Sequence, residues 1–265
     1  MLKRLITGFF LTLLVSVIFY LGNLWLFTSL FFISVLICYE YHISLYEKKF
    51  PSSFYFNIFL IFIFYFITYF KLYNSYFYLQ TIFIIFSLLF GVVCLIELFS
   101  KKIFFNQNPI FHFLKVIYIS CCLPILFYFI RVHDNGLFLL IFIVLNLSFN
   151  DTFAYFTGKL MGKRSLSSIS PNKTIEGSLG GIFSALILSI IISFYSSYSW
   201  IFLASCSVLL SITGQFGDIY ESLIKRTTNK KDSSQLLPGH GGILDRLDSY
   251  IFSLPLICFI IFKLI

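Results

Sequence analysis

Charge is scarce in this sequence. Only 11% of its 265 residues are charged, compared with about 25% in a typical water-soluble domain, whereas 59% are hydrophobic and the mean hydropathy is +0.94. A chain with so little polar material cannot cover a soluble surface. This shortage excludes a soluble enzyme, a nucleic-acid-binding protein and a disordered scaffold as descriptions of the whole chain. It predicts an all-α, polytopic integral membrane protein.

The cysteines lack the spacing of a metal site and the loop positions of a disulfide framework. All six lie in apolar runs: Cys38, Cys94, Cys121, Cys122, Cys206 and Cys258. Free cysteine behaves as a small apolar side chain when it is buried. We therefore expect buried thiols, and neither disulfides nor a zinc site.

Long apolar runs are what the sequence has in abundance. A helix needs about 20 mostly apolar residues to cross the hydrocarbon core of a bilayer. Polar or turn-forming residues separate nine candidate spans, at Leu5 to Tyr20, Leu24 to Cys38, Phe54 to Phe70, Phe77 to Phe99, Phe113 to Ile130, Leu137 to Tyr155, Leu179 to Phe194, Trp200 to Gln215 and Tyr250 to Leu264. Only Gly22 and Asn23 divide the first two, so one long helix is the alternative there.

The 19 basic residues predict the orientation of these spans. With a cytoplasmic N-terminus, 16 of them, including Lys115, fall in cytoplasmic segments, and three, Lys71, Arg131 and Lys263, fall on the opposite side. Basic residues concentrate in cytoplasmic loops, so this distribution predicts about nine spans with the N-terminus inside and the C-terminus outside. The net charge of +8 then reflects cytoplasmic loops and not a nucleic-acid partner.

Acids and glycines are unevenly distributed along the chain. Residues 1–150 hold four of the 11 acids and four of the 14 glycines, whereas residues 151–265 hold seven acids and ten glycines. We therefore expect residues 1–150 to form a lipid-embedded helical scaffold. Residues 151–265 are expected to form a catalytic transmembrane domain with an active site that faces the cytoplasm.

Three acids in the second region have the arrangement of a cation site. Asp218 follows an apolar run, and Asp245 and Asp248 are three residues apart at the expected start of the last helix, where they share one face. An acid at membrane depth is costly unless it meets a polar cavity, a cation or a partner. Carboxylate oxygens suit Mg²⁺. The alternative for Asp218 is an ion pair with Lys225.

A glycine-rich turn precedes Asp245. Gly239, Gly241 and Gly242 permit positive φ angles and a close approach of backbone N–H groups to an anion, next to a helix N-terminus. Basic residues surround this turn: Lys225, Arg226, Lys230, Lys231 and Arg246. Acids, cations and glycines together predict a site for a polyphosphate bound through Mg²⁺. For His240, contact with a substrate phosphate and a hydrogen bond within the turn are both open.

Two further polar segments are expected on the same side of the membrane. Asp151 ends an apolar run and either pairs with Lys159 or lines the same cavity. Ser170 and Thr174 are candidate caps for the next helix, because hydroxyl side chains accept hydrogen bonds from the first backbone N–H groups of a helix. Lys173 lies between them and is placed to reach a phosphate.

These segments resemble a known family. The stretch Ser222-Leu-Ile-Lys-Arg, followed by Lys-Asp and by Leu-Pro-Gly-His-Gly-Gly-Ile-Leu-Asp-Arg-Leu-Asp248, closely resembles the signature of phosphatidate cytidylyltransferases, also called CDP-diacylglycerol synthases. Asp151-x-x-Ala-Tyr, the Ser-Pro-x-Lys-Thr-x-Glu-Gly stretch from Ser170 and Gly217-Asp218 match as well. The resemblance covers roughly the last 115 residues. Residues 1–150 match only as a set of apolar spans.

The resemblance implies transfer of a cytidylyl group from CTP to phosphatidate, with Asp218, Asp245 and Asp248 binding Mg²⁺ and a second cation beside it. A phosphatidate phosphate is already anionic near neutral pH, so its attack on the α-phosphorus of CTP needs positioning and charge neutralisation, not a strong base. We assign neutralisation to Lys225, Arg226 and Arg246. The expected substrate-binding set also includes Asp151, Ser170, Lys173, Thr174, Ser222, Lys231, Asp232, Gly239, His240, Gly241 and Gly242.

The expected partners are CTP, phosphatidate and the lipid of a bacterial-type inner membrane, with no nucleic acid; a homodimer is compatible with the sequence. A related CTP-using lipid enzyme or a lipid kinase would use another acceptor. A cation transporter would place acids in mid-membrane, whereas Asp245 and Asp248 lie at the head of a span. A non-catalytic membrane scaffold has no use for the full set of acids.

Overall fold

The fold is described from a computed structural model. The structure describes residues 20–46, 52–69, 91–100, 122–127, 129–130, 135–227, 233–237 and 241–264, with Leu13, Val17, Ile18, Lys115, Tyr118 and Lys230 as single residues. Within these ranges the named secondary-structure elements are α-helices. Two isolated antiparallel bridges pair Ser165 with Thr174 and Leu237 with Gly241. The all-α prediction is confirmed for this part of the chain. Most of the predicted spans Leu5 to Tyr20 and Phe77 to Phe99, and part of the span Phe113 to Ile130, lie outside the described residues.

The chain divides into two compact units, each built from two segments. The first unit comprises Met1–Phe129 and Ile224–Leu247, and the second comprises Ile130–Leu223 and Asp248–Ile265. Two helices, α8 (Trp200–Thr227) and α9 (Leu244–Leu264), contribute residues to both units. The functional boundary expected near residue 150 stays a prediction.

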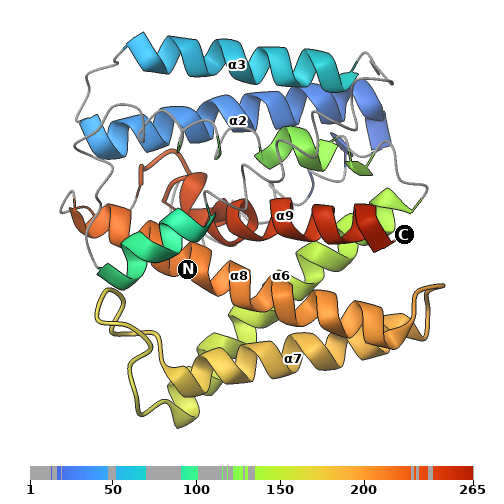
Figure 1. Ribbon diagram of the computed structural model, residues 1–265, viewed down its shortest axis with the longest axis vertical. Coiled ribbons are helices and arrows are strands. Elements are labelled where there is room, and N and C mark those ends of the chain that lie inside the picture. The colour runs from blue at the N-terminus through green and yellow to red at the C-terminus, as the bar shows by residue number, and fades with distance from the viewer. Residues whose placement is uncertain are drawn as a thin grey trace. The chain divides into compact units, whose positions relative to one another are not determined.

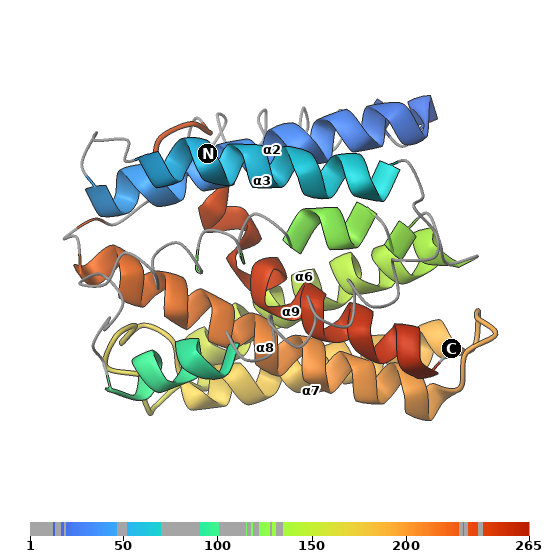
Figure 2. The ribbon, with the colours of Figure 1, turned by 45° about the horizontal axis from the view of Figure 1, so that its top comes forward.

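Helices α2 (Asn23–Tyr46) and α3 (Ser52–Tyr69) lie side by side in the first unit (Figures 1 and 2). Aromatic rings fill the space between them: the ring of Tyr65 packs edge-on against Phe27 and Phe31, with centroids 5.4 and 5.6 Å away. Gly22 interrupts the helical residues before α2 with a φ of +93°, a conformation that glycine adopts without strain. The expected division at this point is therefore confirmed.

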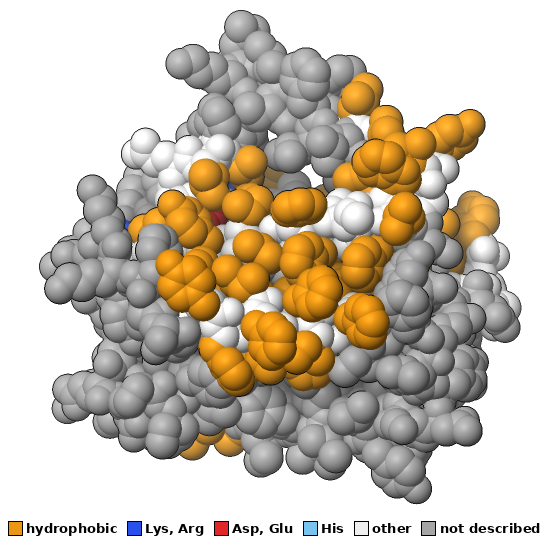
Figure 3. All heavy atoms as spheres, turned by 90° about the horizontal axis from the view of Figure 1, so that it is seen from above, with side chains coloured by type: hydrophobic (Ala, Val, Ile, Leu, Met, Phe, Trp, Pro, Cys, Tyr) orange, Lys and Arg blue, Asp and Glu red, His pale blue; other side chains and the backbone are white. Residues whose placement is uncertain are grey.

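The outer side of α3 is apolar. Tyr55, Phe59 and Phe62 are 65%, 57% and 54% exposed. Figure 3 shows hydrophobic side chains gathered over the described part of this face. Large exposed aromatic side chains are unfavourable in water but suit a lipid environment. Four described helices are long and apolar enough to cross a membrane, at Leu24–Ile43, Gly136–Met161, Ile175–Ser193 and Trp200–Arg226. The chain is accordingly an integral membrane protein.

Helices α6 (Gly136–Met161) and α7 (Ile175–Ser193) pack closely in the second unit (Figure 1). Small residues permit this approach: a Cβ atom at Gly177 would lie 2.7 Å from the backbone oxygen of Ala154, and one at Gly181 would lie 2.6 Å from that of Asn150. Such contacts allow apolar helices to associate where no water is available to drive them together.

Several helices extend at one end beyond the apolar runs that predict them. Helix α8 continues past Gln215 to Thr227, because Ile219, Tyr220 and Leu223 keep a buried face at helical spacing. Helix α2 likewise continues past Cys38, and α9 begins at Leu244, ahead of the apolar run. Hydropathy detects the part of a helix that is apolar enough for lipid. The polar ends of these helices pack against protein, so a hydropathy criterion does not include them.

Two kinds of side chain show how the interior is filled. The five described cysteines are buried thiols, as predicted, while Cys121 lies outside the described residues. Lys115, counted in the orientation argument as a cytoplasmic charge, is 1% exposed and forms an ion pair with Glu97, with Nζ 3.0 Å from Oε2, while its side of the membrane stays a prediction. A lysine can be buried when an acid on a neighbouring segment neutralises it, and loop counting cannot detect such a pair.

Candidate active site

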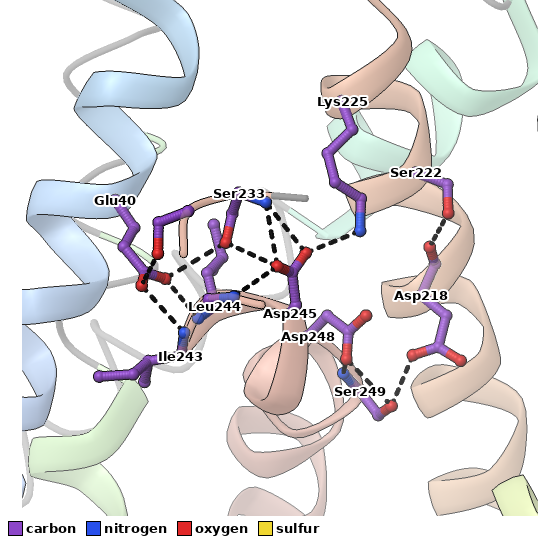
Figure 4. A network of polar contacts seen from close by, with 12 residues as sticks. Glu40, Asp218, Ser222, Lys225, Ser233, Ile243, Leu244, Asp245, Asp248 and Ser249 are labelled. Atoms are coloured by element: carbon purple, nitrogen blue, oxygen red, sulfur yellow. Dashed lines mark hydrogen bonds and ion pairs between the residues drawn. The ribbon is translucent and has the colours of Figure 1, made fainter. Parts of the chain in front are cut away.

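Polar side chains of the second unit form a group that we call the helix cluster: Lys173, Asp218, Asp248 and Ser249. Lys173 Nζ lies 2.8 Å from Asp218 Oδ2. The Ser249 hydroxyl donates to Asp218 Oδ1 at 2.6 Å, and the Ser249 backbone N–H donates to Asp248 Oδ1 at 2.9 Å (Figure 4). The cluster joins the start of α7, the polar end of α8 and the first turns of α9.

Acids crowd the helix cluster. The carboxylate of Asp218 interacts electrostatically with those of Asp151 and Asp248. Asp248 and Glu221 also share a hydrogen bond, which requires one of these two carboxyl groups to carry a proton. Lys173 is the cation paired with Asp218, and its side chain is 37% exposed. Neighbouring carboxylates repel one another when all are ionised, so this arrangement favours a bound cation. Among the described residues, however, no three His, Cys, Asp or Glu side chains are grouped closely enough to hold a metal unaided.

A cavity of about 280 Å³ opens beside the helix cluster, within the second unit. Its lining includes Asp151, Lys159, Lys173, Thr174 and Asp218. Asp151 therefore lines a cavity, which is one of the two sequence alternatives for it. The volume is near the lower end of the range for small-molecule sites.

A chain of amide and hydroxyl groups supports one wall of this cavity. Ser178 Oγ donates to Gln215 Oε1, Gln215 Nε2 donates to Asn150 Oδ1 at 2.9 Å, and Asn150 Nδ2 donates to Asp151 Oδ1 at 3.0 Å. The chain links α7, α8 and α6 in turn. Because each group has a hydrogen-bonding partner, the network fixes the orientation of Asp151.

The segment between α6 and α7 is held by backbone contacts. Thr174 is the N-cap of α7, and its hydroxyl accepts from Gly177 N at 3.1 Å, as the sequence predicts. Ser170 plays another part: its carbonyl accepts from Lys173 N at 3.1 Å and closes a turn. Glu176 Oε2 accepts the backbone N–H groups of Lys163 and Arg164 at 3.0 and 3.2 Å. These contacts direct the Lys173 side chain toward Asp218.

Polar groups of the first unit form a second group, the loop cluster: Glu40, Lys225, Ser233, Gly242 and Asp245. Asp245 Oδ1 lies 2.8 Å from Lys225 Nζ. Asp245 Oδ2 accepts from Ser233 N at 3.0 Å, from Ser233 Oγ at 3.0 Å and from Gly242 N at 2.8 Å (Figure 4). Both oxygens of Asp245 are thus engaged by protein donors, and its side chain is 8% exposed.

Glycine is required where the loop meets α9. Gly241 has a φ of +82°, and its carbonyl accepts from Leu237 N at 2.9 Å. A Cβ atom at Gly242 would overlap the hydroxyl of Ser233 and would lie 2.8 Å from Glu40 Oε2. Side chains other than hydrogen are excluded at Gly242 because both neighbouring groups are held in the same cluster.

Comparison with protein families decides the affiliation of the chain. The model of the cytidylyltransferase family matches residues 2–264, which is almost the whole chain. The chain belongs to the cytidylyltransferase family.

Individual family members are similar over part of their length. The chain is 42% identical over 162 residues to the phosphatidate cytidylyltransferase of Staphylococcus haemolyticus, covering 60% of this chain and 61% of that protein. It is 40% identical over 181 residues to the phosphatidate cytidylyltransferase of Bacillus subtilis, covering 65% of this chain and 66% of that protein. Each alignment spans less than two thirds of the relative.

The structure also places other predicted site residues of this cytidylyltransferase-family chain. Asp218 pairs with Lys173, and not with Lys225, which pairs with Asp245. Ser222 donates its hydroxyl to the backbone oxygen of Asp218 at 2.8 Å. Arg226 and Arg246 are exposed: Arg226 ends the polar part of α8, and Arg246 lies in the first turn of α9. Four predicted residues lie outside the described chain: Lys231, Asp232, Gly239 and His240.

The sequence analysis did not identify three residues that organise the two clusters and the cavity wall of this cytidylyltransferase-family fold. Glu40 is 0% exposed and belongs to the loop cluster, although it lies in residues 1–150, which the sequence presents as scaffold. Ser249 joins two predicted metal acids, and Gln215 organises the cavity wall. The signal for Glu40 was available, because an acid in an apolar run needs a partner. Ser249 and Gln215 carry no comparable signal.

Proposed function

We propose that the chain is a phosphatidate cytidylyltransferase, which converts CTP and phosphatidate to CDP-diacylglycerol and pyrophosphate. The observation that carries the proposal is the helix cluster, where crowded carboxylates lie beside a lysine and a cavity. This chemistry suits a nucleotide polyphosphate that brings its own cation. The cytidylyltransferase-family match over residues 2–264 supports the same activity.

The acids of the helix cluster fit Mg²⁺. Mg²⁺ is commonly held by one or two carboxylates together with substrate phosphates, and not by a cage made of protein alone. Asp218 and Asp248 meet that requirement, and the lack of a three-residue group among the described side chains is consistent with it. Asp245 belongs to the proposed metal set through its helical spacing from Asp248, and a second cation is part of the proposal. Bound Mg²⁺ would neutralise phosphate charge and help align the reacting groups.

The basic side chains would bring the two anionic substrates together. Lys173 and Thr174, which line the cavity, would contact phosphate oxygens there. Lys225, Arg226 and Arg246 would neutralise the lipid phosphate and the departing pyrophosphate. The lipid phosphate attacks the α-phosphorus of CTP, a P–O bond forms to the lipid, and the bond to pyrophosphate breaks. Positioned charges supply most of the rate enhancement for such a transfer, so no general base is assigned.

The proposed remaining substrate contacts and the membrane topology come from the sequence. We assign substrate binding to Asp151, Ser170, Ser222, Lys231, Asp232, Gly239, His240, Gly241 and Gly242. The topology has about nine spans, a cytoplasmic N-terminus and an active site on the cytoplasmic face of a bacterial-type inner membrane. The distribution of 16 against three basic residues supports this orientation, and a homodimer is compatible with it.

Transfer of label tests the activity. Detergent-purified protein is mixed with phosphatidate, Mg²⁺ and CTP labelled at the α-phosphate, and label entering the lipid phase is counted. We expect transfer that EDTA prevents and that Asp248→Asn loses, while Glu97→Gln, a change at a buried acid outside both clusters, retains transfer per folded molecule. Label from the γ-phosphate in the lipid would indicate a lipid kinase instead. No transfer to any phospholipid or isoprenoid phosphate, with cation flux in the same protein, would favour a transporter.

A further inference from the structure

Glu40 is a buried acid of the N-terminal helix α2 that contacts the loop carrying the family signature. It is 0% exposed, and its carboxylate accepts hydrogen bonds from both ends of that loop. At the beginning, Ser234 Oγ donates to Oε1 at 2.6 Å and Ser233 Oγ donates to Oε2 at 3.3 Å. At the end, Ile243 N donates to Oε1 at 2.9 Å and Leu244 N donates to Oε2 at 2.7 Å (Figure 4).

The contacts with Ile243 and Leu244 place a negative charge at the start of α9. The first N–H groups of a helix have no partner within the helix and carry partial positive charge, so a carboxylate satisfies them better than a neutral acceptor. A buried carboxylate is itself tolerated only when donors surround it. Glu40 and the start of α9 therefore depend on each other.

Glu40 is connected to Asp245 through a shared hydroxyl. Ser233 Oγ lies 3.3 Å from Glu40 Oε2 and 3.0 Å from Asp245 Oδ2, so the same serine contacts both acids. Gly242, whose N–H donates to Asp245, packs against Glu40 as well. A change in the position or charge of the Glu40 carboxylate must therefore disturb the donors that hold Asp245.

We propose that Glu40 is a positioning residue for the reaction: its carboxylate holds Ser233 and Ser234 together with Ile243 and Leu244, and so positions Gly242 and Asp245. The inference rests on the proposed function. It gives the N-terminal region, which the sequence presents as scaffold, a direct part in arranging the site. Glu40 itself touches no reacting atom.

The variant Glu40→Gln keeps the size of the side chain and removes its charge and one acceptor. The matched control is Glu97→Gln, which changes another acid that is 0% exposed in the same unit and is paired with Lys115. Both variants are expected to lower stability. Only Glu40→Gln should alter the loop.

Four measurements on the whole chain in detergent separate positioning from stability. We expect Glu40→Gln to lower kcat per folded molecule and to raise the Mg²⁺ concentration for half-maximal turnover, each by about 10- to 100-fold, as is typical of groups that orient metal ligands. KM for phosphatidate should stay within about twofold, because removing such a group acts mainly on the transition state. In metal-free protein, amide exchange should accelerate in a peptide containing Ile243 and Leu244 and stay unchanged in α7.

The outcomes are distinct. Unchanged kcat per folded molecule and unchanged exchange at Ile243 and Leu244 overturn the inference, as does an identical response in Glu97→Gln. If the wild type transfers no label, the proposed function fails, and the exchange experiment still decides whether Glu40 orders the loop. If Glu40→Gln does not fold, Ser234→Ala removes one contact to Glu40. That variant must then change kcat and exchange in the same direction to a smaller extent, and wild-type behaviour overturns the inference.

Discussion

Asp245 in the loop cluster and Asp218 in the helix cluster each lie 2.8 Å from a lysine, but only Asp218 also has other carboxylates acting on it in the helix cluster. Asp245 is surrounded by donors, namely the N–H and hydroxyl of Ser233 and the N–H of Gly242. Asp218 also accepts the Ser249 hydroxyl, but it interacts in addition with two other carboxylates, those of Asp151 and Asp248. Asp245 is therefore stabilised by donors, whereas Asp218 meets donors and like charges together.

This difference distinguishes an acid that also orders the loop around it from an acid whose neighbouring charges favour a bound cation. An acid whose oxygens meet several donors stabilises the fold and orders the loop around it. An acid crowded by other acids destabilises the fold until a cation arrives. We therefore expect substitutions in the two clusters to shift stability in opposite directions.

The largest effect is expected from Asp248→Asn. It should lower turnover by about 100- to 1000-fold, as removal of an electrostatic contact to a transition state does. Its thermal midpoint without Mg²⁺ should equal or exceed that of the wild type, because a like charge has been removed from beside Asp218. Label transfer and thermal unfolding in the same detergent provide the two values. A clear fall in the midpoint would remove the distinction between the clusters.

Addition of Mg²⁺ should stabilise the wild type. A ligand at 100 times its dissociation constant stabilises the folded state by about 2.7 kcal/mol, if it does not bind the unfolded chain. We expect a rise in the midpoint with Mg²⁺ and a much smaller rise in Asp248→Asn. Titration with Mg²⁺ at constant ionic strength measures both, and Na⁺ at matched ionic strength is the control. Equal rises in the two proteins would place the cation elsewhere.

Asp245→Asn should destabilise the protein. The amide has one acceptor oxygen in place of two, so Lys225, Ser233 and Gly242 lose part of their partner, at a cost of about 2 kcal/mol for hydrogen bonds to a charged group. Chemical or thermal unfolding without Mg²⁺ measures the loss. The comparison with Asp248→Asn is decisive, because the two substitutions are chemically identical and three residues apart. A shift of the same sign in both would contradict the proposed division.

The smallest effect is expected from Thr174→Ala, which removes the N-cap of α7. Loss of a cap costs about 1 kcal/mol. Turnover should fall only severalfold. Lys173 directly precedes the N-cap residue, but its ion pair with Asp218 also holds it in place. Ser193→Ala, at the other end of α7, removes a hydroxyl contact to Ile190 O and should change stability by less than about 0.5 kcal/mol. Equal losses in the two variants would show that the cap has no special role.

Local relations were accessible from the sequence. The positions of Asp245 and Asp248 in the first turns of the last helix follow from helical spacing, and the cap by Thr174 follows from the preference of hydroxyl side chains for that position. The apolar runs located α3 and the beginning of α6 within two residues, because hydropathy reports lipid-facing residues directly.

Long-range relations were not accessible in this way. Lys173 and Asp218 are separated by 45 residues, and Glu40 and Leu244 by 204, so no spacing rule connects them. The pairing of Asp218 with Lys225 was a reasonable local expectation, but tertiary packing supplied other partners to both residues. An acid in an apolar run indicates that the folded protein supplies it with a hydrogen-bonding or ion-pair partner, but the sequence does not say which residue that is.

The separation between Glu40 and its partners also has a consequence for biosynthesis. Glu40 is synthesised 204 residues before Leu244. At about 5–20 residues per second, roughly 10 to 40 s pass before the loop that receives its carboxylate leaves the ribosome. During this interval α2 must enter or approach the membrane with an acid whose final donors do not yet exist. The N-terminal unit can therefore reach its final packing only near the end of translation, and chains truncated before the start of α9 should be early targets of membrane quality control.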